Sequence, residues 1–316
     1  MPIKTVKYQK ILILIILFCA LPFLLSCDKL AQLPFTGVTG KLAYVRTKEM
    51  NKFEVVILDL ASNKKDIIKL DAFRIGGLDF SPDGKYLTAH TEFKWSKNKH
   101  ISIIDIEKKA IKNILENEQR LMFPKFSPDF SKLVFYRLDT KKENQKTIYT
   151  SKTNGKDIMQ LTRNIDNCMY PEWHPDPGTN KIVFISKDRR IIEQDIVSTK
   201  QSVIYALSAS DNIQNLHFPV YSKDGQKLLF IECLGGGIQR PSQIKMISLS
   251  SGEIKSIYKT EHLIGSANFI NDSVICFSDV NLPNSEIVLY NYKLKRKKLI
   301  KDPGYFIIYP AWTPGS

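Results

Sequence analysis

The chain has 316 residues and a formal net charge of +14 at pH 7. In a cytosolic protein such a basic composition would suggest a nucleic acid as partner. Here the leader described below directs the chain out of the cytosol, which argues against nucleic-acid-binding proteins. An anionic surface of the cell envelope is then the expected binding partner for the positive charge. Among the five cysteines, Cys168, Cys233 and Cys276 lie in the body of the chain at wide spacing, which excludes a disulfide framework and a zinc site of closely spaced ligands.

The first 26 residues have the pattern of a secretory signal peptide. Lys4, Lys7 and Lys10 form a positive start, and the 15 residues at 11–25 carry no charge. Because a membrane-spanning helix needs about 20 apolar residues, a cleaved leader is the better interpretation. Cleavage would remove three lysines and lower the net charge to +11.

The leader ends in Leu24-Leu25-Ser26-Cys27, which resembles the lipobox of bacterial lipoproteins. The resemblance implies that Cys27 receives a diacylglyceryl group, that the signal is cut before it, and that the freed amine is acylated. Several acyl chains anchor a protein stably, whereas one binds only marginally. An ordinary signal peptide with an incidental cysteine is the alternative. Asp28 resembles the residue that retains lipoproteins in the inner membrane of enteric-type bacteria, which would be the periplasmic face in a Gram-negative host.

Residues 27–40 are expected to form a lipidated tether. No strand pattern occurs there, and Pro34, Gly37 and Gly40 interrupt the segment. The 13 residues after Cys27 extend over at most about 45 Å. The folded domain is expected at residues 41–316, where every segment has the pattern of a strand or a turn.

One short sequence motif occurs six times from residue 77 onward. It consists of an aromatic residue, a tight polar turn and an apolar strand. The aromatic residues are Phe80, Phe126, Trp173, Tyr221, Phe269 and Trp312, at spacings of 46, 47, 48, 48 and 43 residues. This period, filled with strand signals, predicts an all-β propeller with one four-stranded antiparallel blade per repeat.

The two ends of the domain together supply the strands of one blade. Three strands at 42–46, 54–60 and 66–70 precede the first aromatic residue, and a solitary strand at 309–312 follows the last full repeat. Together they make one whole blade, so we predict six blades, the first closed by the C-terminal strand. Such a closure removes an open strand edge.

The turns support this division of the chain. Ser81-Pro82-Asp83-Gly84 places proline and glycine where a tight turn needs them. Phe130 stands where glycine is expected and must tolerate strain or change the turn type. The repeated turn aspartates (Asp83, Asp129, Asp176, Asp224 and Asp272) are expected to form turns and not a catalytic ring.

The phrase Leu-Asp-Phe-Ser-Pro-Asp-Gly-Lys-Tyr-Leu at 78–87 resembles the WD40-like (PD40) repeat of the TolB propeller family. The resemblance covers residues 41–316 and implies the fold. It does not choose a function, because the repeat also occurs in binding proteins, in peptidase propellers and in polysaccharide lyases. TolB carries a further domain before its propeller, where this chain has only the tether.

Few residues suggest chemistry. A peptidase would need a nucleophile elbow and a hydrolase domain, and the sequence has neither. No two of the five histidines are separated by the number of residues that is common between metal ligands. His174 takes a turn position, whereas His217 precedes an inner strand near the channel mouth and is a candidate contact residue. We therefore expect no catalytic residue, no metal and no cofactor.

Two exposed segments are candidates for partner binding. The loop at 93–99 combines Phe93 and Trp95 with lysines that include Lys97, and aromatic and basic residues are common at interfaces. The outer hairpin of the sixth blade carries Lys295, Arg296 and Lys297; these residues would either meet an anionic membrane or only protect a strand edge from aggregation.

The function expected from the sequence is that of a lipid-anchored, monomeric binding or scaffold module of the bacterial cell envelope. Its partner would be an envelope protein or a cell-wall polymer, not a nucleic acid, and its N-terminal lipid would hold it to the membrane. The alternative is a polysaccharide-lyase-like enzyme with a metal-assisted site in the channel, where His217 or His174 would lie near the metal. The sequence leaves open whether Cys168 and Cys233 pair.

Overall fold

The computed structural model describes residues 35–49, 52–70, 72–93, 99–117, 120–139, 145–163, 165, 167–208, 213, 215–235 and 240–314. Contacts between residues divide the chain into one unit at 1–37 and another at 38–316, and the architecture below is that of the second unit. Among the residues described, no helix is long and apolar enough to cross a membrane.

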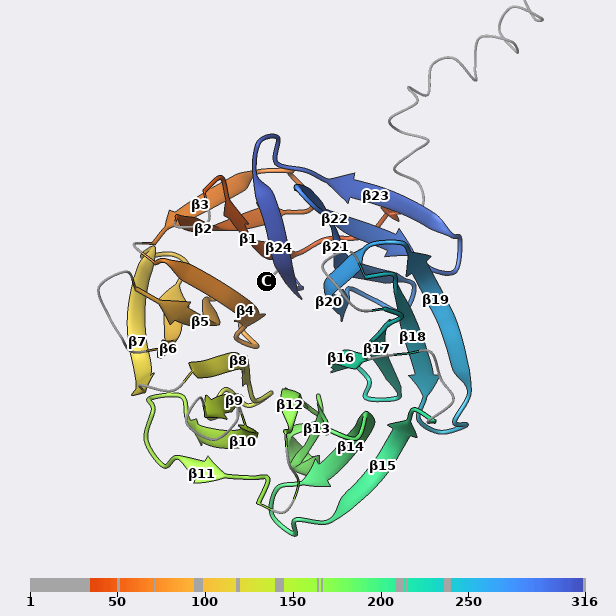
Figure 1. Cartoon of the computed structure of the whole chain (residues 1–316). Helices are drawn as coiled ribbons and strands as arrows, with labels where there is room; N and C mark the ends of the chain where they lie inside the picture. The colour runs from red at the N-terminus through yellow and green to blue at the C-terminus, as the bar shows by residue number, and fades with distance from the viewer. Residues whose placement is uncertain are drawn as a thin grey trace, which may run out of the picture. The chain divides into compact units, whose positions relative to one another are not determined.

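Six four-stranded antiparallel sheets surround a central axis as the blades of a propeller (Figure 1). Blade two contains β4 (Arg74–Phe80), β5 (Tyr86–Glu92), β6 (Lys99–Asp105) and β7 (Ala110–Asn117). Blade three contains β8 (Arg120–Phe126), β9 (Lys132–Asp139), β10 (Gln145–Lys152) and β11 (Met159–Gln160). Blade four contains β12 (Met169–Trp173), β13 (Lys181–Ile185), β14 (Arg190–Asp195) and β15 (Gln201–Ala206).

The remaining blades follow the same plan from the axis to the rim. Blade five contains β16 (Asn215–Tyr221), β17 (Lys227–Cys233), β18 (Ser242–Ser248) and β19 (Ile254–Thr260). Blade six contains β20 (Leu263–Phe269), β21 (Val274–Asn281), β22 (Asn284–Asn291) and β23 (Arg296–Ile300). Blade one contains β24 (Phe306–Thr313), β1 (Lys41–Thr47), β2 (Phe53–Asp59) and β3 (Lys65–Lys69).

The C-terminal strand closes the ring, as the sequence predicts. β24 is the inner strand of blade one and pairs antiparallel with β1, with Lys41 opposite Thr313 and Thr47 opposite Phe306. The Trp312 indole also donates a hydrogen bond to the Thr39 carbonyl, 3.0 Å away. Both ends of the domain therefore build one sheet, which leaves no inner edge exposed at the seam.

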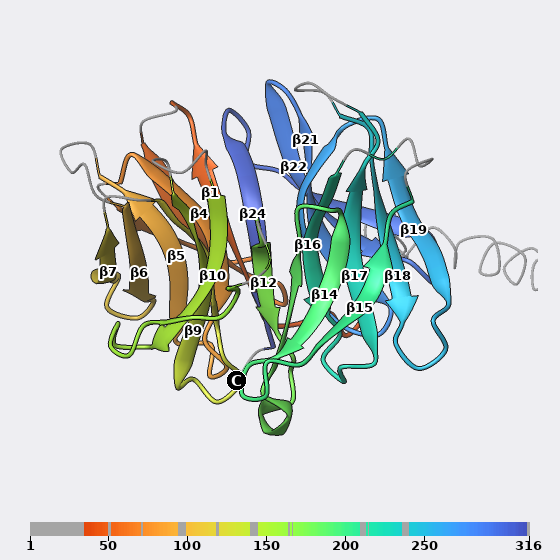
Figure 2. The same cartoon turned by 60° about the horizontal axis from the view of Figure 1, so that its bottom comes forward.

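Each blade has strands A to D from the axis to the rim, and these strands run between the two faces of the ring (Figure 2). All inner strands run in the same direction. The turns that link strands A to B and C to D lie on one face, named the A–B face. The loops that link strands B to C lie on the other face, named the B–C face.

Two elements differ from the sequence prediction. The inner strands begin earlier than expected, for example at Arg74 and not at Gly77, because the chain continues in the ladder before a break described below. The turn after Trp173 is longer than its counterparts and contains a short 3-10 helix, η3 (Pro177–Thr179), with Asp176 as its N-terminal cap. Proline at the first position and an aspartate cap both favour such a start.

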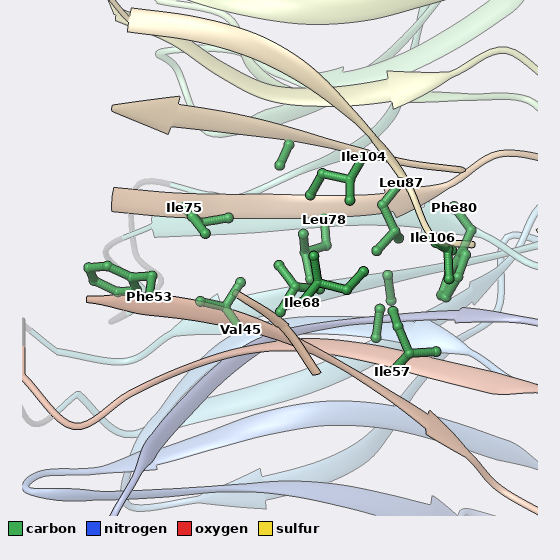
Figure 3. Close-up of a cluster of buried hydrophobic side chains, with 14 of the residues drawn as sticks. Val45, Phe53, Ile57, Ile68, Ile75, Leu78, Phe80, Leu87, Ile104 and Ile106 are labelled. Carbon is green, nitrogen blue, oxygen red and sulfur yellow. The ribbon is translucent and has the colours of Figure 1, made fainter. Parts of the chain in front are cut away.

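Apolar side chains of neighbouring blades form the core. Between blades one and two, Val45 and Ile57 pack against Leu78 and Leu87, and Ala311 of the C-terminal strand joins the cluster (Figure 3). Burial of one such leucine or isoleucine side chain stabilises the fold by roughly 1.5–3 kcal/mol. Cys276 is fully buried, as expected of a core residue, and Cys168 and Cys233 are buried thiols that no disulfide joins.

Four of the five turn aspartates are structural, whereas in blade six the side chain of Asn271, and not that of Asp272, accepts the hydrogen bonds of the turn, from the Ser273 and Val274 amides. Ser81 Oγ donates to Asp83 Oδ1 over 2.6 Å, and the Ser127–Asp129 and Ser222–Asp224 pairs repeat this bond. Phe130 tolerates strain, since it keeps the left-handed conformation of the glycine it replaces, with φ of 62°. Its ring stacks on Tyr86 of blade two, 5.7 Å away between centroids, which offsets that strain.

Candidate functional site

Every inner strand has a break in its pairing with the second strand, three residues before the repeated aromatic residue. Five of the six residues at this break adopt the left-handed conformation: Gly77, Phe123, Tyr170, Phe218 and Tyr309. Four of these are aromatic, and positive φ is rare for bulky residues. Strain of this kind persists where the surroundings over-determine it and is frequent at functional sites.

The aromatic side chains at the breaks meet on the axis and form a plug. The ring centroid of Phe123 lies 5.1 Å from Tyr170, 5.2 Å from Phe218 and 5.8 Å from Tyr309. These residues belong to blades three, four, five and one, so contact among them requires that they converge on the centre. The plug lies across the axis between the A–B ends and the B–C ends of the inner strands.

A pocket open to solvent lies on the A–B side of the plug, and we name it the funnel. Its floor is the plug, and its walls include Lys125, Glu172, Val220 and Asn268. Ser266 occupies the sixth position of the plug with a short side chain, which leaves space on that side. The Ser266 hydroxyl is buried and has no hydrogen-bond partner among the described residues.

Lys125 lies in the funnel wall and joins the carboxylates of Asp79 and Glu172, of which only Glu172 lines the pocket. Its Nζ lies 3.2 Å from Asp79 Oδ1 and 3.1 Å from Glu172 Oε2. The three side chains come from neighbouring inner strands and expose between 16% and 21% of their surface. One ammonium therefore faces two carboxylates, and the wall carries a net negative charge when both acids are ionised.

The pairing changes the acid–base behaviour of this triad, formed by Asp79, Lys125 and Glu172. Burial raises the pKa of Glu172 to about 7; the Lys125 ammonium opposes the rise, and the Asp79 carboxylate adds to it. Burial also raises the pKa of Asp79. For Lys125, burial acts to lower the pKa, but the two carboxylates outweigh it and hold that pKa above its usual value. The charge of the funnel therefore changes near neutral pH.

We expect Glu172 to make the fold less stable as pH rises. Its pKa is higher in the folded chain than in the unfolded chain, so its contribution is fully present below about pH 4.5 and is lost as pH rises through about 7. Replacement by Gln removes this dependence. Urea unfolding of the wild type and Glu172→Gln between pH 4.5 and 8 should therefore differ in pH slope, by on the order of 1–3 kcal/mol over the range. The exposed Glu253→Gln should keep the wild-type slope, and an unchanged slope in Glu172→Gln would contradict the assignment.

The structure places His217 beside the plug on the B–C side, away from the funnel. Its Nδ1 lies 3.2 Å from the Tyr170 hydroxyl, and its buried Nε2 has no hydrogen-bond partner among the described residues. Burial, together with the charges of Arg240 and Lys146, lowers the pKa of His217 to about 4, so the ring is neutral at pH 7.

His174 does not come near His217. It follows the inner strand of blade four on the A–B face, where its Nδ1 accepts a hydrogen bond from the Asp176 amide over 3.2 Å. This is the turn role that the sequence predicts. Within the described part of the chain, no three His, Cys, Asp or Glu side chains lie close enough together to hold a metal ion.

The other predicted contact residues fall in separate places. Phe93 is half-buried rather than exposed, because it packs on the core between blades one and two, with His100 edge-on at 5.3 Å. Lys295, Arg296 and Lys297 lie exposed at the rim of blade six. Trp95, Lys97 and the lipidation candidate Cys27 lie outside the described residues.

The triad was not predicted from the sequence. Asp79, Lys125 and Glu172 lie 46 and 47 residues apart, so no local motif contains them. Each, however, directly precedes the repeated aromatic residue of its blade. A comparison of equivalent positions in successive repeats would have placed the three side chains side by side around the axis.

A closed ring of six four-stranded antiparallel blades, with aromatic side chains meeting on its axis, defines a six-bladed β-propeller. The family model PD40, described as the TolB beta propeller domain, matches residues 35–316. The chain therefore belongs to the TolB β-propeller family. No curated protein matches it.

Solved structures share the fold at low sequence identity. TolB from Acinetobacter baumannii is 17% identical with a TM-score of 0.74, over 91% of this chain and 70% of that one. A putative TolB from Agrobacterium tumefaciens is 14% identical with a TM-score of 0.62, over 87% of this chain and 99% of that one. An oligogalacturonate lyase in complex with manganese is 12% identical with a TM-score of 0.55, over 80% and 74%.

Proposed function

We propose that this protein is a lipid-anchored, non-catalytic binding module of the bacterial cell envelope, whose funnel receives a segment of an envelope protein or of a cell-wall polymer. The observation that carries the proposal is the funnel itself, a concave site with an aromatic floor and few polar groups. Ligand sites in proteins commonly combine an apolar lining with a small number of placed polar groups. Membership of the TolB propeller family is consistent with a binding role.

The chemistry of the funnel limits what it accepts. The plug and the prolines of the inner strands offer apolar contact, whereas Lys125 and Glu172 place a cation and a carboxyl group in the wall, and Asp79 contacts Lys125 from outside the lining. The buried Ser266 hydroxyl adds a hydrogen-bonding group without a partner of its own. A segment with an apolar group beside a cationic or hydrogen-bond-donating group fits this site best.

The anchor rests on the sequence of the leader. A signal peptide at 1–26 and a lipidated tether at 27–40 would hold the propeller to a membrane through Cys27, on the periplasmic face of the inner membrane in a Gram-negative host because of Asp28. Labelling of growing cells with radioactive palmitate should mark the wild type and leave Cys27→Ala unlabelled. Equal labelling of both proteins would refute the anchor.

In-cell photo-crosslinking tests the funnel as the binding surface. A photoreactive amino acid replaces Val220, which lines the funnel, or Val203, which is 51% exposed at the rim of blade four and serves as the matched control. We expect one reproducible adduct from position 220 and none of the same mass from position 203. Repeated absence of an adduct at 220, or the same adduct at both positions, would contradict the proposal.

The lyase alternative requires a metal near His217 or His174. The likeness to the lyase structure is one of fold alone, and these two histidines lie on opposite sides of the plug. We expect no rise in melting temperature of the full chain with manganese, calcium or acidic oligosaccharides, because only binding to the folded state raises it. A rise with manganese that is lost in His217→Ala would favour the enzyme.

A further inference from the structure

The turn between strands C and D of blade six differs from its five counterparts at one position, although the turn of blade four also exposes an apolar side chain, Val197, one position earlier. Each of the six turns contains a left-handed residue shortly before strand D, which we use to align them: Asn63, Lys109, Gly155, Thr199, Gly252 and Lys295. The residue before it is polar in the other five blades, where it is Ser62, Lys108, Asn154, Ser198 or Ser251. In blade six it is Leu294, with 59% of its surface exposed.

Cations surround this exposed leucine. Lys293, Lys295, Arg296 and Lys297 are exposed, and none of them forms a salt bridge within the described residues. The equivalent turn of blade two also has two lysines, but each is compensated there: Lys108 lies 3.3 Å from Asp105, and Lys109 contacts Asp66. Blade six therefore presents excess positive charge around an apolar tip, together with Leu299, which is 38% exposed on the adjoining strand.

The chain enters the propeller on the same face as this turn, at the neighbouring blade. Thr39 and Lys41 lie at the A–B face of blade one, held by Trp312 and by pairing with Thr313. The basic turn lies on the same face of blade six, the neighbouring blade, and the inner strands of the two blades pack together. The 13 residues between Cys27 and Lys41 reach at most about 45 Å.

We propose that the segment at 293–299, named the basic rim, docks on an anionic lipid bilayer. The proposal rests on the lipid anchor proposed above, which would bring this part of the propeller within reach of the membrane. Lysine and arginine near an anionic membrane each contribute about 1 kcal/mol, which is roughly fivefold in affinity. An apolar side chain among cations fits the boundary between headgroups and acyl chains.

The exposed leucines favour a bilayer over a soluble acidic polymer. A polyanion would satisfy the four cations but would leave Leu294 and Leu299 in water, whereas a membrane surface satisfies both.

A polarity-sensitive dye on the lipidated full-length protein tests the docking. The dye is attached to Leu294→Cys or, as the matched control, to Ser251→Cys at the equivalent position of blade five. The native Cys168, Cys233 and Cys276 are fully buried and should not react. Each protein is reconstituted in vesicles of phosphatidylcholine alone or with added phosphatidylglycerol.

We expect a blue shift of the emission at position 294 on phosphatidylglycerol vesicles, reversed by high salt, and no shift at position 251. Four further substitutions in the Leu294→Cys background (Lys293→Gln, Lys295→Gln, Arg296→Gln and Lys297→Gln) should abolish the shift. Equal emission on both vesicle types, or an equal shift at 251, would overturn the proposal. A shift with soluble polygalacturonate but not with vesicles would assign the basic rim to an acidic polymer instead.

The two proposals fail in different ways. If the protein carries no palmitate and does not remain on vesicles, the anchor is wrong. If the lipidated protein remains on the vesicles and position 294 gives no shift, the anchor stands and the docking alone is wrong.

Discussion

A chain that lacks residues 306–316 should lose cooperative unfolding altogether. This truncation removes β24, the inner strand of blade one, and leaves the whole inner edge of β1 without hydrogen-bond partners. It also removes the buried side chains Ile307 and Ala311 and takes Tyr309 out of the plug. The loss of several buried apolar groups, at roughly 1.5–3 kcal/mol for each large one, together with a strand ladder, is comparable to the entire 5–15 kcal/mol of a typical domain.

Thermal unfolding followed by circular dichroism measures this effect. A chain that lacks only residues 315–316 provides the matched control, because β24 is then complete, and we expect it to melt as the full chain does. A sharp transition in the longer truncation, at the melting temperature of the full chain, would show that the C-terminal strand does not close the ring.

Replacement of Lys125 by methionine should destabilise the protein by about 3–5 kcal/mol at pH 8, because it leaves two carboxylates together without their cation. Methionine keeps the length of the side chain, so the effect reports charge more than volume. At pH 5 the loss should be smaller, since Glu172, with a pKa of about 7, takes up a proton and relieves the repulsion.

Urea unfolding at the two pH values tests this expectation. Lys112→Met, which removes an exposed lysine from blade two, should change the free energy of unfolding by less than about 0.5 kcal/mol. Addition of Asp79→Asn and Glu172→Gln to Lys125→Met should restore most of the lost stability. A loss that is the same at both pH values and is not restored would mean that the triad is not a coupled charge system.

The sequence alone was sufficient to predict the architecture, because the same repeat motif occurs six times along the chain. The aromatic residue before each turn marks the end of an inner strand. One copy of the motif is divided between the two ends of the domain, at residues 309–312 and 42–46, and this division predicts the closed seam. Even Phe130, which breaks the turn pattern, keeps the conformation of the glycine it replaces, since the surrounding blade fixes the backbone there.

The site was predictable only in part because its parts come from different blades. Tyr170 and Tyr309 precede proline within their strands, and nothing local indicates that they take left-handed conformations and meet Phe123 on the axis. We predicted His217 before an inner strand near the channel mouth, but it lies within β16 beside the plug, where burial and the charges of Arg240 and Lys146 keep its ring neutral at pH 7. Exposure was also misjudged for Phe93, since a residue at the start of a loop can still pack inward.

Amide hydrogen exchange of the lipidated protein, measured with and without the molecule captured at position 220, tests the binding role of the funnel most directly. We predict slower exchange in the inner strands β12, β16 and β20, which line the funnel, and unchanged exchange in the outer strand β15. Slower exchange confined to outer strands, or no change in the inner ones, would contradict a funnel that holds the partner.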